Sequence, residues 1–589
     1  MRSLAWRGGV FLTLALGAVS TAACSSDEPS TRQSPSAAAG TSASGGASGA
    51  GGSGAATGGI GATGGAAAGT GGTTALAGGS TSSGGSSVLG ARVRRLASPE
   101  YDASVQALLG TTAAPASGPD FPPDLRQDGF TVNDAQRVDA VIIERLADAA
   151  EALATEAQAN GTLARLAPCA TGDEPTTCAK KFVTTFGAKV YRRPLVDEEV
   201  TALLALYAAG ADGADYDEGI AQVTRGLLQS AGFLYLTELG DAPPGSGRVE
   251  LAPYELASAL SYLLTSAPAD DELVAKATGG KLADPAEREA EARRLLANDP
   301  RARETVVRLV REWLGIDRVD DSAKDTLVYP DFEALKPSIV AESKDFVRAV
   351  AFESTGNVSE LFGANWTVNS GPLALYRTAG SGPIQGSTLL DDRVGILNQA
   401  AFLATYANAH ESHPIFRGVA IARRVVCLPL DSPASFDLTV VPPAPDPTRT
   451  TRQRFSVHPA DSICAGCHDI IDPFGFAFEH FDGMGAYRNE ENGQDVDSSV
   501  VVSLEADYDG PYADSNAMAA ALAASPSIRE CMARYIFRAA AASGDSAATA
   551  GEPEFVDFWR SLPAASNGNI VESLIAYVKS PNFVLREAL

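Results

Sequence analysis

Residues 464–488 read CAGCHDIIDPFGFAFEHFDGMGAYR, and the interpretation of the whole chain starts from this stretch. Cys464 and Cys467 are separated by two residues, and His468 follows directly. This spacing suits the attachment of one haem c, because each thiol can add to one vinyl group while the imidazole of His468 binds the iron from one face. The stretch therefore predicts a c-type haem site.

Three other interpretations fit the same cysteine pair. The first is a simple disulfide between Cys464 and Cys467, and the second is a thioredoxin-like redox pair. The second needs an α/β fold, whereas strand patterns are scarce here and Asp472-Pro473 soon follows the motif. The third is a zinc site of His458, Cys464, Cys467 and His468, in which two adjacent ligands would bind one tetrahedral ion awkwardly.

A haem would need a second axial ligand, or would leave one iron position open. All five histidines of the chain lie between His410 and His480, which favours one metal-related region. We expect Met484 as the sixth ligand and His458 as the next choice. Without either, the iron could bind or reduce a small oxidant such as peroxide, and this difference separates an enzyme from an electron carrier.

The N-terminus predicts export. Residues 1–23 have the basic start and short apolar core of a signal peptide. Thr21-Ala22-Ala23-Cys24 resembles a bacterial lipobox, in which cleavage leaves Cys24 carrying lipid, although leucine is usual where Thr21 stands. Ordinary signal-peptidase cleavage near Ala23 is the alternative. The position directly after Cys24 is serine and not the aspartate that often retains such proteins at the inner membrane, so the outer membrane is favoured.

Residues 24–88 predict a disordered linker after the lipidated cysteine. Glycine, alanine, serine and threonine dominate this segment, and large apolar or charged residues are almost absent. Such a composition buries too little surface to offset the conformational entropy of the chain. At about 5 to 6 Å times the square root of its length, the linker would hold the body on the order of 40 to 50 Å from its anchor.

The folded body, residues 89–589, is expected to be mainly α-helical, with a loop-rich cytochrome c-like segment. One helix is expected to have Ser98 as its cap and Pro99 as its first residue, and to stop at Gly110. The Asp-Pro pairs at 284–285 and 299–300 are each expected to start another helix. Helices are also expected over 331–353 and 391–408, and a strand or hairpin over 496–504. The predicted modules are residues 89–160, 161–245 with Cys169 and Cys178, 246–380, 381–510 with the CxxCH motif, and 511–589.

The remaining cysteines predict two disulfides in an oxidising compartment. Cys169 and Cys178 flank a short polar loop, so a local disulfide is the simplest account. Once the other cysteines are assigned, Cys427 and Cys531 are left as a pair, which would join the segment before the haem motif to the C-terminal helices.

Several motifs follow one another along the body: Arg94-Arg95-Leu96 through Gly110, Tyr191-Arg192-Arg193-Pro194-Leu195, Tyr254-Glu255-Leu256-Ala257-Ser258, Glu312-Trp313-Leu314, Ser412-His413-Pro414 with Arg417-Gly418, and Cys464 through Arg488. In this order they resemble a multidomain family of exported bacterial proteins, abundant in planctomycetes and myxobacteria, that carry a planctomycete-type cytochrome c domain. The resemblance covers essentially the whole body and implies a haem c, but it implies no reaction. Ala259 and Thr265 depart from it, since they stand where the family tends to have arginine and tryptophan. His413 also departs from the family pattern, because it stands where the family motif has a serine-like residue.

Within the last motif, Glu479, Asp482 and Arg488 are expected to fix a loop by hydrogen bonds or ion pairs. Gly475 and Gly485 are expected to permit turns or a close approach to the macrocycle.

The sequence thus predicts an outer-membrane lipoprotein, periplasmic or on the cell surface, that acts in electron transfer or haem-dependent oxidoreduction. Its expected partners are the membrane, through the lipid, and a redox protein. A net charge of −26 argues against nucleic acid. The alternative function is a cell-surface binding or structural lipoprotein in which Cys464 and Cys467 form only a disulfide.

Overall fold

The computed structural model describes residues 88–212, 215–241, 247–430, 443–456, 462–542 and 552–588, with the backbone alone at 462–464. The predicted signal peptide, Cys24, the linker up to residue 87 and His458 lie outside these residues. No helix within the described ranges is long and apolar enough to cross a membrane.

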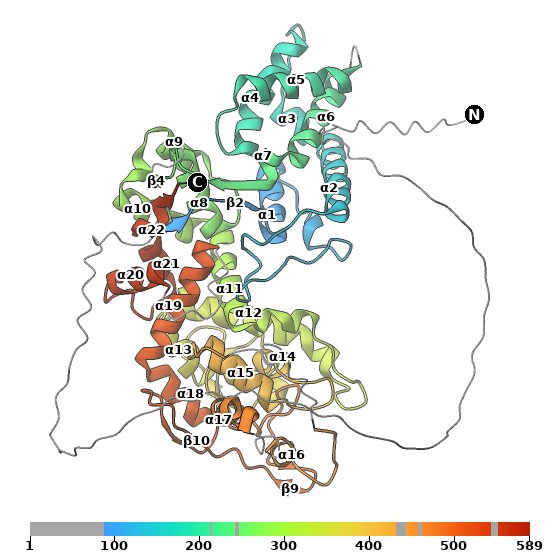
Figure 1. The fold of residues 1–589 in the computed structure, drawn as a ribbon. Helices are drawn as coiled ribbons and strands as arrows, with labels where there is room; N and C mark the ends of the chain where they lie inside the picture. The colour runs from blue at the N-terminus through green and yellow to red at the C-terminus, as the bar shows by residue number, and fades with distance from the viewer. Residues whose placement is uncertain are drawn as a thin grey trace, which may run out of the picture. The chain divides into compact units, whose positions relative to one another are not determined.

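The described body is mainly helical, as the sequence predicts (Figure 1). The first group of helices is α1 (Ser98–Leu109), α2 (Ala140–Ala159), α3 (Thr162–Leu166), α4 (Pro175–Tyr191), α5 (Asp197–Ala211), α6 (Tyr216–Gln229) and α7 (Ala231–Leu234). The second group is α8 (Pro253–Thr265), α9 (Asp271–Thr278), α10 (Pro285–Asn298), α11 (Pro300–Leu314), α12 (Phe332–Glu353) and α13 (Val358–Gly363).

The third group is α14 (Ala400–Thr405), α15 (Pro414–Arg424), α16 (Thr451–Phe455) and α17 (Ser462–Phe476). The last is α18 (Ser515–Ala524), α19 (Pro526–Ala541), α20 (Pro553–Ser561), α21 (Ile570–Lys579) and α22 (Pro581–Val584). Short 3-10 helices occupy Pro115–Ser117, Lys281–Ala283, Ile316–Asp321, Leu373–Leu375 and Ile396–Asn398.

Local sequence signals fix many helix starts. The carboxylate of Asp284 accepts the main-chain N–H of Ala286 at the start of α10, where Pro285 is the first residue. Asp299 and Pro300 begin α11 in the same way. In each pair the aspartate accepts a main-chain N–H that has no partner within the helix, and proline has no N–H that would need one. Both predicted starts are therefore confirmed.

The strands form small sheets that join distant segments. In the described residues, β1 (Leu89–Gly90) pairs in parallel with β12 (Leu585–Glu587), which also pairs antiparallel with β4 (Arg248–Glu250). The other antiparallel sheets are β2 (Arg92–Arg95) with β3 (Tyr235–Glu238); β5 (Trp366–Val368), β7 (Ser387–Leu390) and β6 (Thr378–Ser381); β8 (Glu490–Glu491) with β9 (Gln494–Asp495); and β10 (Val500–Val502) with β11 (Gly510–Tyr512). The strand expected within 496–504 is therefore confirmed as β10.

Two buried apolar clusters hold these elements. One lies among α1–α7 and includes Phe182 and Phe233. The other runs from α8 to α22 and includes Trp313, which is fully buried and donates its indole N–H to the carbonyl of Arg424 at 2.7 Å. That hydrogen bond ties α11 to the end of α15, the helix that packs on the CxxCH segment.

Both predicted disulfides are present. Cys169 and Cys178 are joined with their Cα atoms 5.5 Å apart, between the loop after α3 and the start of α4. Cys427 and Cys531 are joined at the same Cα distance and connect the end of the α15 segment to α19.

Two sequence predictions are wrong in part. Only α14 forms an α-helix within 391–408, because the chain turns at Gly395, whose φ of +70° lies outside the right-handed helical range. The cap of α1 is Ala97 rather than Ser98. The carboxylate of Glu100 accepts the N–H of Ala97 at 3.0 Å, which is the glutamate half of a capping box.

Candidate functional site

The CxxCH motif lies in the first turns of α17. Cys464 and Cys467 are three residues apart on this helix, so they share one side of it. Cys467 is a partly buried free thiol, whereas Cys169, Cys178, Cys427 and Cys531 are all in disulfides. The side chain of Cys464 lies outside the described part of the chain.

A carboxylate orients the histidine of the motif. The Nδ1 atom of His468 lies 2.8 Å from Oδ1 of Asp472, one helical turn later. The hydrogen bond to Asp472 raises the pKa of His468, and the charge of Asp469 acts in the same direction. Metal-binding histidines commonly have their second ring nitrogen bonded to a carboxylate, which fixes the tautomer and the ring orientation. The arrangement of His468 is of this kind.

Two glycines bring α17 close to α15. A Cβ on Gly418 would lie 2.2 Å from the carbonyl oxygen of Ile471, and one on Gly475 would lie 2.0 Å from that of Pro414. These paired positions run in opposite directions along the chain, so the helices are antiparallel. Gly475 therefore permits a close approach to α15, a role that the sequence analysis did not assign to it.

A buried arginine on α15 holds the chain that follows α17. The side chain of Arg417 is fully buried and donates to the carbonyls of Phe478, Phe481 and Asp482 at 3.1, 2.9 and 2.7 Å. Burial lowers the pKa of Arg417 to about 10. Sequence reasoning missed this role, although the Arg417-Gly418 pair of the family motif is a signal for it.

The loop after α17 is also fixed by the acidic and basic residues that the sequence singles out. Arg488 donates to the carboxylate of Glu479 at 3.1 Å, and Ser412 donates to the same carboxylate at 3.3 Å. Asp482 accepts the main-chain N–H groups of Met484 and Ala486, both at 2.9 Å. The predicted role of these residues is confirmed.

Gly485 supplies a turn in this loop. Its φ is +93°, and a Cβ there would lie 2.9 Å from the Cα of Ala400. The approach of either glycine to a macrocycle stays a prediction.

The candidates for a second axial ligand have different surroundings. Met484 is partly buried against the larger apolar cluster. The Nδ1 atom of His480 lies 2.9 Å from the carbonyl oxygen of Arg488, and its ring stacks on Tyr487. His413 caps α15 by accepting the N–H of Phe416, and burial lowers its pKa to about 4, so it is neutral near pH 7. Met484 as sixth ligand stays a prediction, and so does His458.

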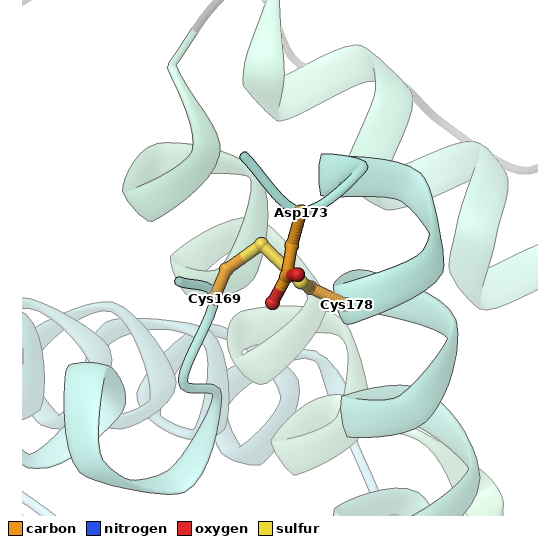
Figure 2. A group of neighbouring side chains, drawn as sticks. All are labelled: Cys169, Asp173 and Cys178. Atoms are coloured by element: carbon orange, nitrogen blue, oxygen red, sulfur yellow. A yellow bond between two sulfur atoms is a disulfide. The ribbon is translucent and has the colours of Figure 1, made fainter. Parts of the chain in front are cut away.

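A second group of ligand-type side chains lies at the start of α4 (Figure 2). Cys169, Asp173 and Cys178 place their ligand atoms within 4.8 Å of one another. Figure 2 shows the two sulfurs bonded to each other. Because disulfide sulfurs are not thiolates, this group is a cross-link with a neighbouring carboxylate and is not a metal site in this form.

The donor set on α17 fits a covalently attached haem. The described side chains supply one free thiol, Cys467, and one oriented imidazole, His468. The sequence supplies the second thiol at Cys464, three residues before Cys467 on α17. Asp472 supplies the hydrogen bond that holds the imidazole.

Comparison with protein families matches four segments, in order, to models that are each described as a protein of unknown function. They are DUF1587 (PSD3) at residues 94–159, DUF1595 (PSD5) at 178–238, DUF1592 (PSD4) at 251–376 and DUF1588 (PSCyt3) at 393–491. The chain combines four modules of unknown function. These matches support the multidomain family that the motifs resemble. No curated protein and no solved structure matches the chain.

The PSCyt3 match contains the whole candidate site. Its residues 393–491 include α15, α17, the two glycines of their contact and the loop fixed by Arg417 and Arg488. The name of this model points to a cytochrome c-type domain.

Proposed function

We propose that this chain is a c-type haem protein of electron transfer or haem-dependent oxidoreduction. The observation that carries the proposal is a free thiol, Cys467, directly before an imidazole that Asp472 orients, both on one helix of the PSCyt3 match. When bound, the haem would supply one-electron redox chemistry and, at an open iron position, binding of small oxidants.

The residues of the chain have separate tasks in this proposal. Cys464 and Cys467 anchor the group through their sulfurs, and His468 provides the proximal nitrogen. The hydrogen bond to Asp472 would favour the tautomer of His468 with its proton on Nδ1, in which Nε2 is the nitrogen that could bind iron. Arg417 holds the loop of Met484 through main-chain carbonyls, so a ligand from this loop would be positioned without a large loss of chain entropy.

We further propose that the protein is exported and held at the outer membrane by lipid on Cys24. The supporting observations are the signal-like residues 1–23, the lipobox-like Thr21–Cys24 segment and the polar linker that follows. A disulfide-bonded body agrees with an oxidising compartment. The partner would be another redox protein within reach of the linker.

A haem spectrum tests the central proposal. The full chain would be expressed through the periplasm together with the cytochrome c maturation machinery. We expect a c-type pyridine haemochrome that stays with the protein after acid-acetone extraction. Cys464→Ala and Cys467→Ala should lose or alter it, because each removes one thioether bond.

Matched controls separate chemistry from misfolding. The Cys169→Ala/Cys178→Ala variant removes two cysteines outside the PSCyt3 match and should keep the spectrum. His468→Ala should lose the normal iron ligation. His410→Ala, which changes an exposed histidine paired with Asp325, should not. Absence of haem from all samples, with Cys464 and Cys467 recovered as a disulfide, would contradict the proposal and favour the disulfide-bonded surface protein.

The state of the iron then separates carrier from enzyme. If Met484 ligates, Met484→Ala should create carbon monoxide binding and peroxide reactivity that the unchanged protein lacks. If the unchanged protein already binds carbon monoxide, the position is open and haem-dependent oxidoreduction is the better account.

A further inference from the structure

A cavity of about 50 Å³ lies apart in sequence from the CxxCH helix. Its wall comes from β2, α8, α11, the end of α19, α21 and β12, so it lies where the first modules meet the C-terminal segment. One water needs about 10 to 15 Å³ of such space. The cavity is therefore large enough for several waters or for one small ion.

Arginine dominates the polar part of the wall, which includes Arg92, Arg94, Arg308 and Arg586. Glu238 also lines the cavity, but two of these arginines already share it. Arg92 donates to it at 2.9 and 3.0 Å, and Arg586 donates to it at 2.8 Å. One carboxylate thus balances two guanidinium groups at this side of the cavity.

Of the other two arginines, only Arg94 has its charge paired with a carboxylate in the described part of the chain. Arg94 donates to both oxygens of Glu100, at 2.6 and 2.7 Å. Arg308 has no ion pair with a carboxylate among the described residues, and its Nη2 atom donates to the hydroxyl of Ser266 at 2.8 Å. Glu312 also lines the cavity, but the partner of its carboxylate is the hydroxyl of Thr131, which donates to it at 2.6 Å. Even with Glu312 ionised, the four arginines outnumber the three carboxylates, Glu238, Glu100 and Glu312. The wall therefore carries an excess of positive charge.

Several buried donors on this wall have no protein acceptor in the described ranges. They are Nη1 of Arg92, Nε of Arg94, Nη1 of Arg308 and the hydroxyl of Tyr577. Arg94 is 6 % exposed and Tyr577 is 1 % exposed, so bulk solvent does not satisfy them. Buried donors without a partner reduce stability, and charged ones reduce it most.

We infer that this cavity binds one small oxyanion, of the carboxylate or phosphate type. A guanidinium group presents several N–H donors in a planar fork that matches the oxygens of such an anion. Water could accept some of these hydrogen bonds but would not balance the excess charge. A metal cation is disfavoured by the same arginines. This inference is independent of the haem proposal, since no residue of α15 or α17 lines the cavity.

The position of the cavity gives the anion a structural effect. It would bridge β2, near the start of the described body, to α11 and the C-terminal elements. A ligand that binds only the folded protein raises the melting temperature, and the increase saturates with ligand concentration.

Thermal unfolding and calorimetric titration test the inference on the full chain. Inorganic phosphate and acetate are added separately at constant ionic strength, with sodium chloride as the reference salt. We expect heat of binding and a saturable rise in Tm of about 2 to 4 °C for at least one of the two anions. A response to only one of them would identify whether the site prefers phosphate or a carboxylate.

Three variants locate the effect. Arg308→Gln should weaken the apparent affinity by about tenfold or more, because a charged donor is lost. Arg303→Gln removes the same charge from an exposed position on the same helix and should change nothing. Ala259→Met fills the cavity from α8 without changing the charge and should abolish binding, which tests the inference even if Arg308→Gln does not fold.

The opposite result is equally clear. No saturable response to either anion would mean that the cavity holds water only and would overturn the inference. An equal response in Arg308→Gln, Ala259→Met and the unchanged protein would also overturn it, because the anions would then act elsewhere.

Discussion

A buried glutamate in α12 should make the stability of the body depend on pH. Glu342 is fully buried and accepts hydrogen bonds from the hydroxyls of Thr367 and Tyr376, both at 2.5 Å. Burial raises the pKa of Glu342 to about 7, and these two hydrogen bonds with the charge of Arg393 limit the increase. The carboxyl is therefore protonated in the folded protein at a pH where it is ionised in the unfolded chain.

The sign and size of the effect follow from this difference. The contribution of Glu342 to stability is fully present below pH 4.5, the ordinary pKa of the group. It is lost as pH rises through the folded value of about 7. At about 1.4 kcal/mol for each tenfold change in proton concentration, the loss is about 3 kcal/mol between these limits.

Glu342→Gln isolates this contribution, because a neutral amide of similar shape does not titrate. The free energy of unfolding is measured in urea at pH 4.5 and pH 8, with the fluorescence of Trp366, beside Thr367, among the reporters. We expect the free energy of unfolding to fall from pH 4.5 to pH 8 by about 3 kcal/mol less in the variant than in the wild type. Glu333→Gln, at an exposed position of α12, should keep the wild-type pH dependence.

Parallel pH profiles for the wild type and Glu342→Gln would refute the reasoning. They would mean that Glu342 keeps its charge in the folded state, so that its hydrogen bonds and Arg393 outweigh burial. A variant that is less stable by the same amount at every pH would lead to the same conclusion.

Two further predictions concern the contact of α15 with α17 and the disulfide that joins the α15 segment to α19. Gly418→Ala should lower the free energy of unfolding by about 1 to 3 kcal/mol in urea titrations, because a Cβ there meets a carbonyl oxygen of α17 at 2.2 Å. Gly466→Ala, inside the CxxCH motif, has open space around its Cβ and should be tolerated; equal losses in both would contradict this. Replacing Cys427 and Cys531 by serine should cost about 4 kcal/mol, since that disulfide spans 104 residues. An unchanged unfolding midpoint would show that the cross-link adds no stability.

Sequence reasoning worked best where structure is decided locally. The predicted helix over 331–353 nearly coincides with α12 (Phe332–Glu353), and the two predicted Asp-Pro starts are those of α10 and α11. Caps, proline and apolar spacing act over a few residues, so a single sequence carries them. The prediction over 391–408 failed because the chain turns at Gly395 with a φ of +70°, where it packs against Phe362, a neighbour distant in sequence.

The residues of the candidate site that would carry chemistry were predictable from the sequence, whereas the contacts that hold them in place were less so. The CxxCH spacing and the polar residues Glu479 and Arg488 could be picked out, because the spacing is specific and the polar residues lie close to it in the chain. Arg417 could not be assigned its role, since its acceptors are main-chain carbonyls that carry no sequence signal. The cavity of arginines was invisible too, because it is assembled from elements far apart in the chain.

The sheet of β1, β12 and β4 makes folding a non-local event. β12 is its central strand, so neither β1 nor β4 has a partner in this sheet until residues 585–587 have been made. Until then, both strands keep unpaired edges that other chains could join. Pairing across the whole body also carries a large loop-closure cost, which slows folding. Early folding intermediates are thus the form most exposed to aggregation. Separation of nascent chains from one another should therefore raise the yield of folded protein.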